Sequence, residues 1–117
     1  MAGELTPFNP RRLEDLSGGD RDFEHELIRT YRASARDALA TLTQALLSRN
    51  RAEIQQAAHK LKGMNSNLGA EGLAGLYQRV LDLLSQDSDF DAIEACVAEI
   101  EGQQAALEDA LHARANG

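Results

Sequence analysis

The sequence is poor in several residue types, and their scarcity narrows the possible folds. Among 117 residues there is no Trp, 4% are aromatic, and only two are Pro. A hydrophobic core must therefore be built mainly from aliphatic side chains. The scarcity of Pro, together with abundant Ala and Leu, favours helices. The length allows one compact domain.

Cysteine and long hydrophobic runs are also scarce. The single cysteine, Cys96, excludes an internal disulfide framework and fits a reducing, cytoplasmic environment. No apolar run approaches the roughly 20 residues of a membrane span. The N-terminus has no basic segment followed by an apolar one, as a secretion signal would have. We therefore expect a cytoplasmic protein.

Basic residues are outnumbered, with 12 Lys and Arg against 19 Asp and Glu, for a formal net charge of −7. This balance argues against a nucleic-acid-binding protein. The charge is uneven along the chain. Residues 51–79 carry four basic and two acidic side chains, whereas residues 80–117 carry nine acidic and one basic. The middle of the chain is mildly positive and the C-terminal third is strongly negative.

Hydrophobic residues recur every three or four positions over most of the chain, which predicts amphipathic helices. No segment shows the period of two that is typical of a strand. We predict an all-α protein, an antiparallel up-down four-helix bundle over residues 10–114 with an additional short N-terminal helix. A flexible arm is expected over residues 1–9. The first long helix has a predicted apolar stripe that begins at Phe23, and it ends near Arg49. The long helices are bounded by the capping residues Asp20, Asn50, Gly69 and Ser88.

The segment of residues 54–70 carries the side chains with the clearest chemical potential. On a helical wheel at about 100° per residue, its apolar side chains share one side with Asn65, and His59 points away from them. Lys62 and Gly63 lie one turn after His59, near the same exposed side. We therefore expect a buried Asn65 and an accessible His59.

An exposed histidine of this kind is suited to act as a nucleophile. An imidazole with the ordinary pKa of about 6.5 is largely neutral at pH 7 and keeps a free lone pair. Lys62 is placed to offset the charge of a phosphoryl group. Gly63 leaves space for a partner, although glycine inside a helix costs about 1 kcal/mol. A solvent-facing histidine is most often an ordinary surface residue, so the geometry alone leaves the function open.

The sequences HKLKG at 59–63 and LGA at 68–70 resemble the motif of the histidine-containing phosphotransfer (HPt) family. In that motif His-x-Leu-Lys-Gly is followed by a short run of small residues and then by an apolar residue, Gly and Ala. Residues 22–31 also resemble the second helix of the family, and Leu73-x-x-Leu76 matches the helix packed against the active one. The resemblance extends over most of the chain.

The resemblance implies a helical bundle that carries phosphoryl groups between receiver domains of a two-component phosphorelay. By this resemblance His59 accepts the phosphoryl group from a receiver-domain aspartate and Lys62 is the supporting cation. Gly63 gives access, and Gln78 hydrogen-bonds the imidazole. The implied protein is a monomer whose partners are response-regulator receiver domains and a hybrid sensor histidine kinase, without nucleic acid or membrane. It needs no cofactor or metal of its own, because Mg²⁺ is expected on the receiver. No nucleotide-binding motif occurs, so we expect no autokinase activity.

Met64 and Asn65 depart from the family pattern, which usually has small residues at these two positions. Met64 lies away from His59 on the wheel, so it is expected to change packing and partner fit more than access to His59. Two other functions stay open. One is a non-catalytic helical adaptor that docks receiver domains without phosphotransfer. The other is the HPt module of a chemotaxis-type kinase.

Overall fold

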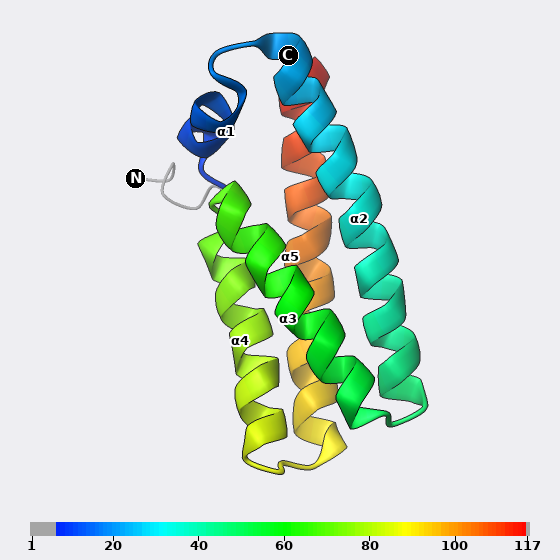
Figure 1. Cartoon of the computed structure of the whole chain (residues 1–117). Coiled ribbons are helices and arrows are strands. Elements are labelled where there is room, and N and C mark those ends of the chain that lie inside the picture. Colours follow the sequence, from blue (N-terminus) through cyan, green and yellow to red (C-terminus); the bar gives the residue numbers. More distant parts are fainter. Residues whose placement is uncertain (1–6, 117) are drawn as a thin grey trace.

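Five helices make up most of residues 7–116, the part of the chain that this computed structural model describes (Figure 1). A short helix precedes four long ones, and the order is α1 (Pro10–Ser17), α2 (Arg21–Leu47), α3 (Arg51–Leu68), α4 (Glu71–Ser85) and α5 (Phe90–Asn116). The long helices alternate in direction, and α1 lies against α2 and α3. No strand occurs in this range. The predicted all-α four-helix bundle with an additional N-terminal helix is confirmed.

Side-chain and glycine caps set the predicted boundaries of α2 and α3. The Asp20 carboxylate accepts the backbone N–H of Phe23 at 3.1 Å, and the Asn50 side-chain oxygen accepts that of Glu53 at 3.1 Å. Each contact satisfies a backbone donor that has no partner within its own helix. Gly69 ends α3 in the left-handed conformation, with φ of 79°. These three caps are confirmed.

The start of the last helix differs from the prediction. The carboxylate of Asp89, and not the hydroxyl of Ser88, accepts the backbone N–H of Ala92, at 3.1 Å. Ser88 belongs instead to the end of α4, where its own N–H donates to the Leu83 carbonyl at 3.0 Å. The turn between α4 and α5 is so short that Ser88 bonds to the end of α4 and the next residue, Asp89, caps α5.

Part of the predicted N-terminal arm belongs to the fold. Residues 1–6 of that arm lie outside the described residues. Phe8 is only 5% exposed and packs into the core. The Asn9 side chain accepts the backbone N–H of Arg11 at 3.0 Å and so caps α1. Residues 8 and 9 are therefore ordered parts of the bundle, because burying an aromatic ring removes a large apolar area from water.

The core between the helices is mainly aliphatic, as the composition predicts, and it also contains both tyrosines. The buried apolar stripe on α2 starts later in the sequence than expected. Phe23 is 49% exposed, whereas Ile28 is buried. Near the start of α2 the side that faces α5 is taken by Glu24, which pairs with Arg114. Phe23 is turned by about 100° from Glu24. No described helix is both long and apolar enough to cross a membrane.

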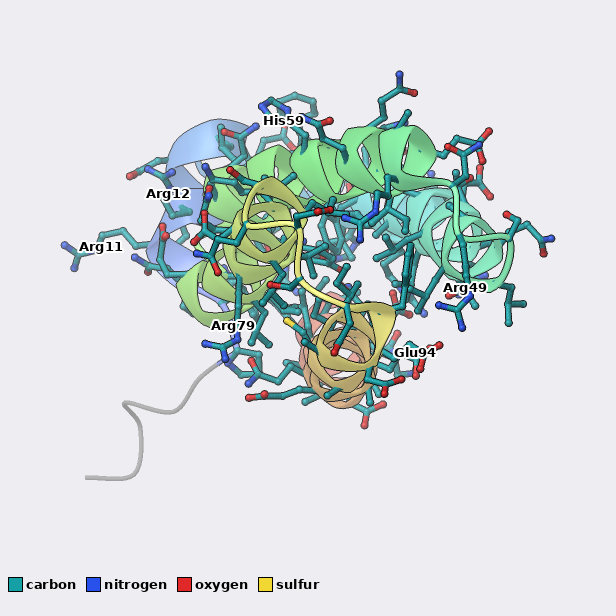
Figure 2. All side chains as sticks on the ribbon, turned by 90° about the horizontal axis from the view of Figure 1, so that it is seen from below. Arg11, Arg12, Arg49, His59, Arg79 and Glu94 are labelled. Atoms are coloured by element: carbon teal, nitrogen blue, oxygen red, sulfur yellow. The ribbon has the colours of Figure 1, made fainter. Side chains whose placement is uncertain are left out.

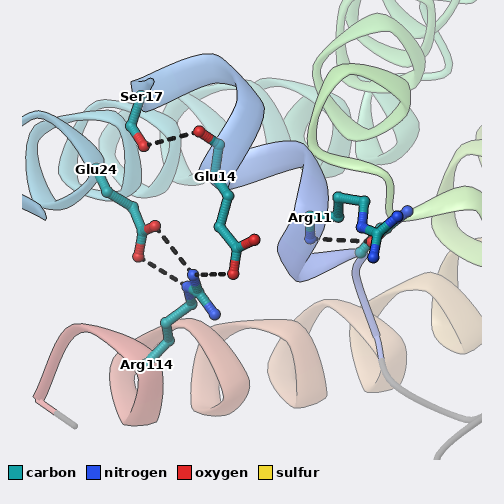
Figure 3. Close-up of polar contacts among 6 residues, drawn as sticks. Arg11, Glu14, Ser17, Glu24 and Arg114 are labelled. Atoms are coloured by element: carbon teal, nitrogen blue, oxygen red, sulfur yellow. Dashed lines mark hydrogen bonds and ion pairs between the residues drawn. The ribbon is translucent and has the colours of Figure 1, made fainter. Parts of the chain in front are cut away.

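An ion cluster joins α1, α2 and α5 at one end of the bundle (Figure 3). The Arg114 guanidinium donates to both carboxylate oxygens of Glu24, at 2.7 and 3.0 Å, and to Glu14 at 3.5 Å. The hydrogen bond from Arg114 lowers the pKa of Glu24 despite the opposing effect of burial. The cluster therefore fixes the ends of α2 and α5 relative to α1.

Candidate functional site

His59 lies in the middle of α3, on the side of the helix that faces away from the core (Figure 2). The neighbouring Ala58 and Leu61 are fully buried, which fixes the face that α3 turns inward. The His59 ring is exposed and is hydrogen-bonded by none of the residues between 7 and 116. It is therefore open to a partner, and its predicted exposure is confirmed.

Lys62 and Gly63 follow His59 by one turn, and Gly63 has no structural need to be glycine. Lys62 is half-buried and Gly63 is exposed. Apart from its chain neighbours and the backbone of its own helix, a methyl group at Gly63 would meet no heavy atom within 4 Å, and the backbone there is ordinary helix. A glycine at such a position weakens the helix by about 1 kcal/mol relative to alanine. Nothing that this glycine contacts within the described fold accounts for that cost.

The second glycine of the motif, Gly69, is required by the fold. Its φ of 79° is strained for any residue with a side chain, and a Cβ there would lie 2.6 Å from Asn9 Cβ and 2.9 Å from Arg12 Cγ. This close approach lets α1 pack over the end of α3. The two glycines of the motif therefore serve different ends, one for folding and one for the exposed surface beside His59.

The structure adds a cation that the sequence reasoning missed. The Arg12 guanidinium, from α1, donates to the Ser66 carbonyl in the last turn of α3 at 3.0 Å. Ser66 lies on nearly the same side of α3 as His59, and α3 itself has no basic residue in its last turn. A cation there complements the negative end of the helix dipole. Periodicity along α3 could not reveal Arg12, because only the packing of α1 brings it there.

Gln78 makes a different contact from the one that the resemblance implies. It is half-buried on α4, and its side-chain amide donates to the Asp82 carboxylate at 2.8 Å. This contact lies within one helix, between residues four positions apart. The role of Gln78 toward His59 stays a prediction.

A largely apolar groove runs between α1, α2 and the other side of α3. Met64 is half-buried in it, and Lys60 stands at its edge. Its other apolar lining residues include Leu13, Leu16, Leu27 and Leu68. Leu16 is 51% exposed. Met64 thus shapes a surface on another flank of α3 and does not cover the His59 ring, as its place on the helical wheel predicts.

Cys96 is a packing residue, as predicted. It is buried on α5, its thiol contacts the Leu76 carbonyl at 3.5 Å, and burial raises its pKa, which keeps the thiol protonated. Among residues 7–116, no three His, Cys, Asp or Glu side chains are grouped so that they could hold a metal ion.

Comparisons with known proteins bear on the family and the fold of the chain. A model of the Hpt domain family matches residues 26–117, a stretch that contains His59, Lys62, Gly63 and Gln78. The crystal structure of histidine-containing phosphotransfer protein B (HptB) from Pseudomonas aeruginosa PAO1 is similar to this chain with a TM-score of 0.86. The two share 21% sequence identity over 96% of each chain, and at that identity the likeness shows a common fold. Among curated proteins, no sequence matches significantly.

Proposed function

This chain belongs to the Hpt domain family, which serves histidine phosphotransfer in two-component signalling, and from that premise we propose that His59 is the phosphoryl-accepting residue. The observation that carries the proposal is the pairing of an exposed His59 with Gly63. Gly63 weakens α3, and none of its contacts in the described fold requires it. A partner that must approach His59 closely gives this glycine its purpose.

In the proposed reaction, a receiver domain that carries phosphoaspartate docks on the exposed side of α3. The lone pair of the neutral His59 ring attacks phosphorus in line, an N–P bond forms, and the bond from phosphorus to the aspartate oxygen breaks. The aspartate leaves as a carboxylate, and the ring nitrogen that does not attack releases its proton to solvent. A second receiver then takes the group by the reverse chemistry. The intermediate divides one transfer into two reversible steps.

The charges around His59 suit a phosphoryl group. Lys62 follows His59 by one turn, and Arg12 adds a positive charge at the C-terminal end of the same helix. Such charges offset the negative charge that develops on the transferring oxygens. The chain supplies the nucleophile and this field, whereas Mg²⁺ and most of the remaining catalysis belong to the receiver.

The proposed partners are response-regulator receiver domains and the hybrid sensor histidine kinase that feeds them. The proposed docking surface includes the exposed side of α3 around His59 and, on the flank of α3 that faces α1 and α2, the groove that contains Leu16, Leu27 and Met64. Phosphotransfer needs each partner to leave after reaction, so we expect a small, transient interface. The protein itself is proposed to act as a cytoplasmic monomer.

A substitution of His59 tests the proposal directly. Receiver domains are first phosphorylated with a small phosphodonor, and the transfer of acid-labile, base-stable phosphate to this chain is measured. His59→Gln is expected to abolish labelling, whereas His112→Gln, at an exposed position on α5, keeps it. Labelling that survives in His59→Gln would contradict the assignment. Receiver binding without any transfer to the unaltered chain would favour a docking adaptor instead.

A further inference from the structure

Four polar side chains cross the hydrophobic core, one from each long helix. They are Tyr31 on α2, Asn65 on α3, Tyr77 on α4 and Gln104 on α5. All four are between 0 and 8% exposed. Polar groups buried in this way are costly unless each is hydrogen-bonded. The presence of these four polar side chains in the core therefore needs an explanation other than the filling of the core volume.

The four side chains form one continuous chain of hydrogen bonds. The Tyr77 hydroxyl donates to Gln104 Oε1 at 2.9 Å, and Gln104 Nε2 donates to the Tyr31 hydroxyl at 2.9 Å. The Tyr31 hydroxyl donates to Asn65 Oδ1 at 2.7 Å. Asn65 Nδ2 then donates to the backbone carbonyl of Leu61 at 2.8 Å. The chain thus connects all four long helices and ends on the backbone of α3.

The Leu61 end determines the direction of every hydrogen bond in the chain. A backbone carbonyl can only accept, so Asn65 must turn its NH₂ group toward Leu61 and its oxygen toward Tyr31. The Tyr31 hydroxyl must then donate to Asn65 and accept from Gln104. Burial raises the pKa of Tyr31 to about 12, so its hydroxyl keeps the proton that it donates at neutral pH. One arrangement satisfies all the partners together.

Directional hydrogen bonds of this kind fix the rotation of a helix about its axis, which aliphatic packing alone leaves adjustable. Contacts between aliphatic side chains are non-directional and tolerate small rotations of a helix, whereas hydrogen bonds weaken steeply when their angles change. The hydrogen bond from the Tyr31 hydroxyl to Asn65 Oδ1 is the contact that ties α3 to another helix, and Asn65 lies on the same helix as His59. We propose that Asn65 and Tyr31 are positioning residues, which fix the rotation of α3 and thereby the direction in which His59 points. This inference rests on the proposed role of His59.

A small rotation of α3 about its axis would move the reactive ring nitrogen of His59 by a large distance. With Cα atoms about 2.3 Å from the axis, a reactive ring nitrogen lies about 6 Å out, and a rotation of about 20° moves it by about 2 Å. A misplacement of about 1 Å can reduce a rate by about a hundredfold. Asn65 stands where the family pattern usually has a small residue, so this positioning device belongs to the particular sequence of this chain.

A matched pair of variants tests the proposal, because each loses one buried hydroxyl from the same chain. Tyr31→Phe removes the donor to Asn65, whereas Tyr77→Phe leaves the bonds from Gln104 through Tyr31 to Leu61 in place. We expect Tyr31→Phe to lower the maximal rate of transfer to His59 by at least about tenfold, with the half-saturating receiver concentration unchanged. Tyr77→Phe should stay within about twofold of the unaltered chain. Rates are compared at a temperature at which both variants are fully folded. Equal rates in the two variants would overturn the proposal.

A fully apolar variant separates positioning from stability. It combines Tyr31→Phe, Asn65→Leu, Tyr77→Phe and Gln104→Leu, and replacing every partner with an apolar group of similar shape is often nearly neutral for stability. We expect it to fold with a melting temperature close to that of the unaltered chain. Its α3 amides should nevertheless exchange hydrogen faster, and its maximal transfer rate should fall at least about tenfold. An apolar variant that transfers at the original rate would also overturn the proposal.

Amide hydrogen exchange also distinguishes this proposal from the proposed function. If the unaltered chain is never phosphorylated, the role of His59 fails. Whether Tyr31 holds α3 in place can still be measured, by comparing the exchange rates of the α3 amides in Tyr31→Phe and in Tyr77→Phe. Faster exchange confined to α3 in Tyr31→Phe supports the positioning of the helix, and identical exchange in both variants contradicts it.

Discussion

At the scale of single residues, the sequence was enough to find His59 but not everything around it. Periodicity placed His59 outside and Asn65 inside, and both placements are confirmed. Both follow from the position of a residue on one helix. Arg12 could not be found in this way, because its contact with Ser66 joins residues 54 positions apart. The partners of Asn65 were hidden for the same reason.

The unexplained glycine beside His59 gives a prediction at this scale. Gly63→Ala should raise the free energy of unfolding by about 0.5 to 1 kcal/mol, because alanine favours helix and the added methyl meets no heavy atom. It should also slow phosphotransfer several-fold, because the methyl lies where the receiver approaches. Urea unfolding and transfer rates measure the two effects.

Gly102 on α5 provides the matched control for Gly63. It is also inside a helix, exposed and free of neighbours within 4 Å. Gly102→Ala is expected to give a similar gain in stability and to leave phosphotransfer unchanged. If Gly63→Ala transfers phosphate as fast as Gly102→Ala, the glycine beside His59 has no role in access.

At the scale of the elements, hydrophobic periodicity and capping chemistry predicted the helices well. Both signals are local, and a cap such as Asp20 acts within three residues. The errors occur where tertiary packing decides. Phe8 is buried against other elements, and Phe23 is exposed because Glu24 takes the inward position to meet Arg114. Neither contact can be predicted from the hydrophobic periodicity of a single segment.

The contact between α2 and α5 through Glu24 and Arg114 gives a prediction with a defined pH dependence. The folded chain holds the pKa of Glu24 below its ordinary value of 4.5, chiefly through the hydrogen bond from Arg114. Its contribution to stability is therefore present above pH 4.5 and is lost as the pH falls through the lower, folded value. Glu24→Gln should lower the free energy of unfolding by about 1 to 2 kcal/mol at pH 7. This difference from the unaltered chain should shrink below pH 4.5.

Glu26 on the same helix is the control for Glu24. Its ion pair with Arg29, at 2.6 Å, joins two largely exposed side chains within one helix. Exposed pairs of this kind contribute little to stability, typically below about 1 kcal/mol. Urea unfolding at pH 7 and pH 3.5 should therefore show a pH-dependent difference for Glu24→Gln but not for Glu26→Gln. Equal behaviour of the two variants would show that Arg114 does not stabilise the bundle through Glu24.

At the scale of the whole molecule, the net charge of −7 is distributed unevenly around the bundle. α3 packs against α2, α4 and α1, whereas α5 lies diagonally across from it. Figure 2 shows His59 on one side of the molecule and the acidic Glu94 of α5 on the opposite side. The strongly acidic helix therefore faces away from the surface on which the receiver is proposed to dock. Composition alone predicted the acidity but could not show this separation.

The buried polar chain gives a prediction for the stability of the molecule at high pH. Burial raises the pKa of Tyr31 from 10.0 to about 12 and raises that of Tyr77 as well. A raised pKa means that the folded state keeps its proton while the unfolded state begins to lose it. The stabilising contribution is therefore complete below pH 10 and is lost as the pH rises from 10 toward 12. Each tyrosine lowers the free energy of unfolding by up to about 1.4 kcal/mol per pH unit in this window.

The composition makes this prediction unusually direct to measure, because Tyr31 and Tyr77 are the only tyrosines in the sequence. Tyrosinate absorbance therefore reports on the buried chain alone, and far-ultraviolet circular dichroism reports on the helices. We expect both signals to change together above pH 10, since ionisation of either hydroxyl breaks a contact that links the four long helices. The double variant Tyr31→Phe, Tyr77→Phe should lose stability less steeply over the same range. Tyrosinate that forms near pH 10 while the helical signal stays constant would show that the hydroxyls are open to solvent and that their ionisation does not disturb the packing of the helices.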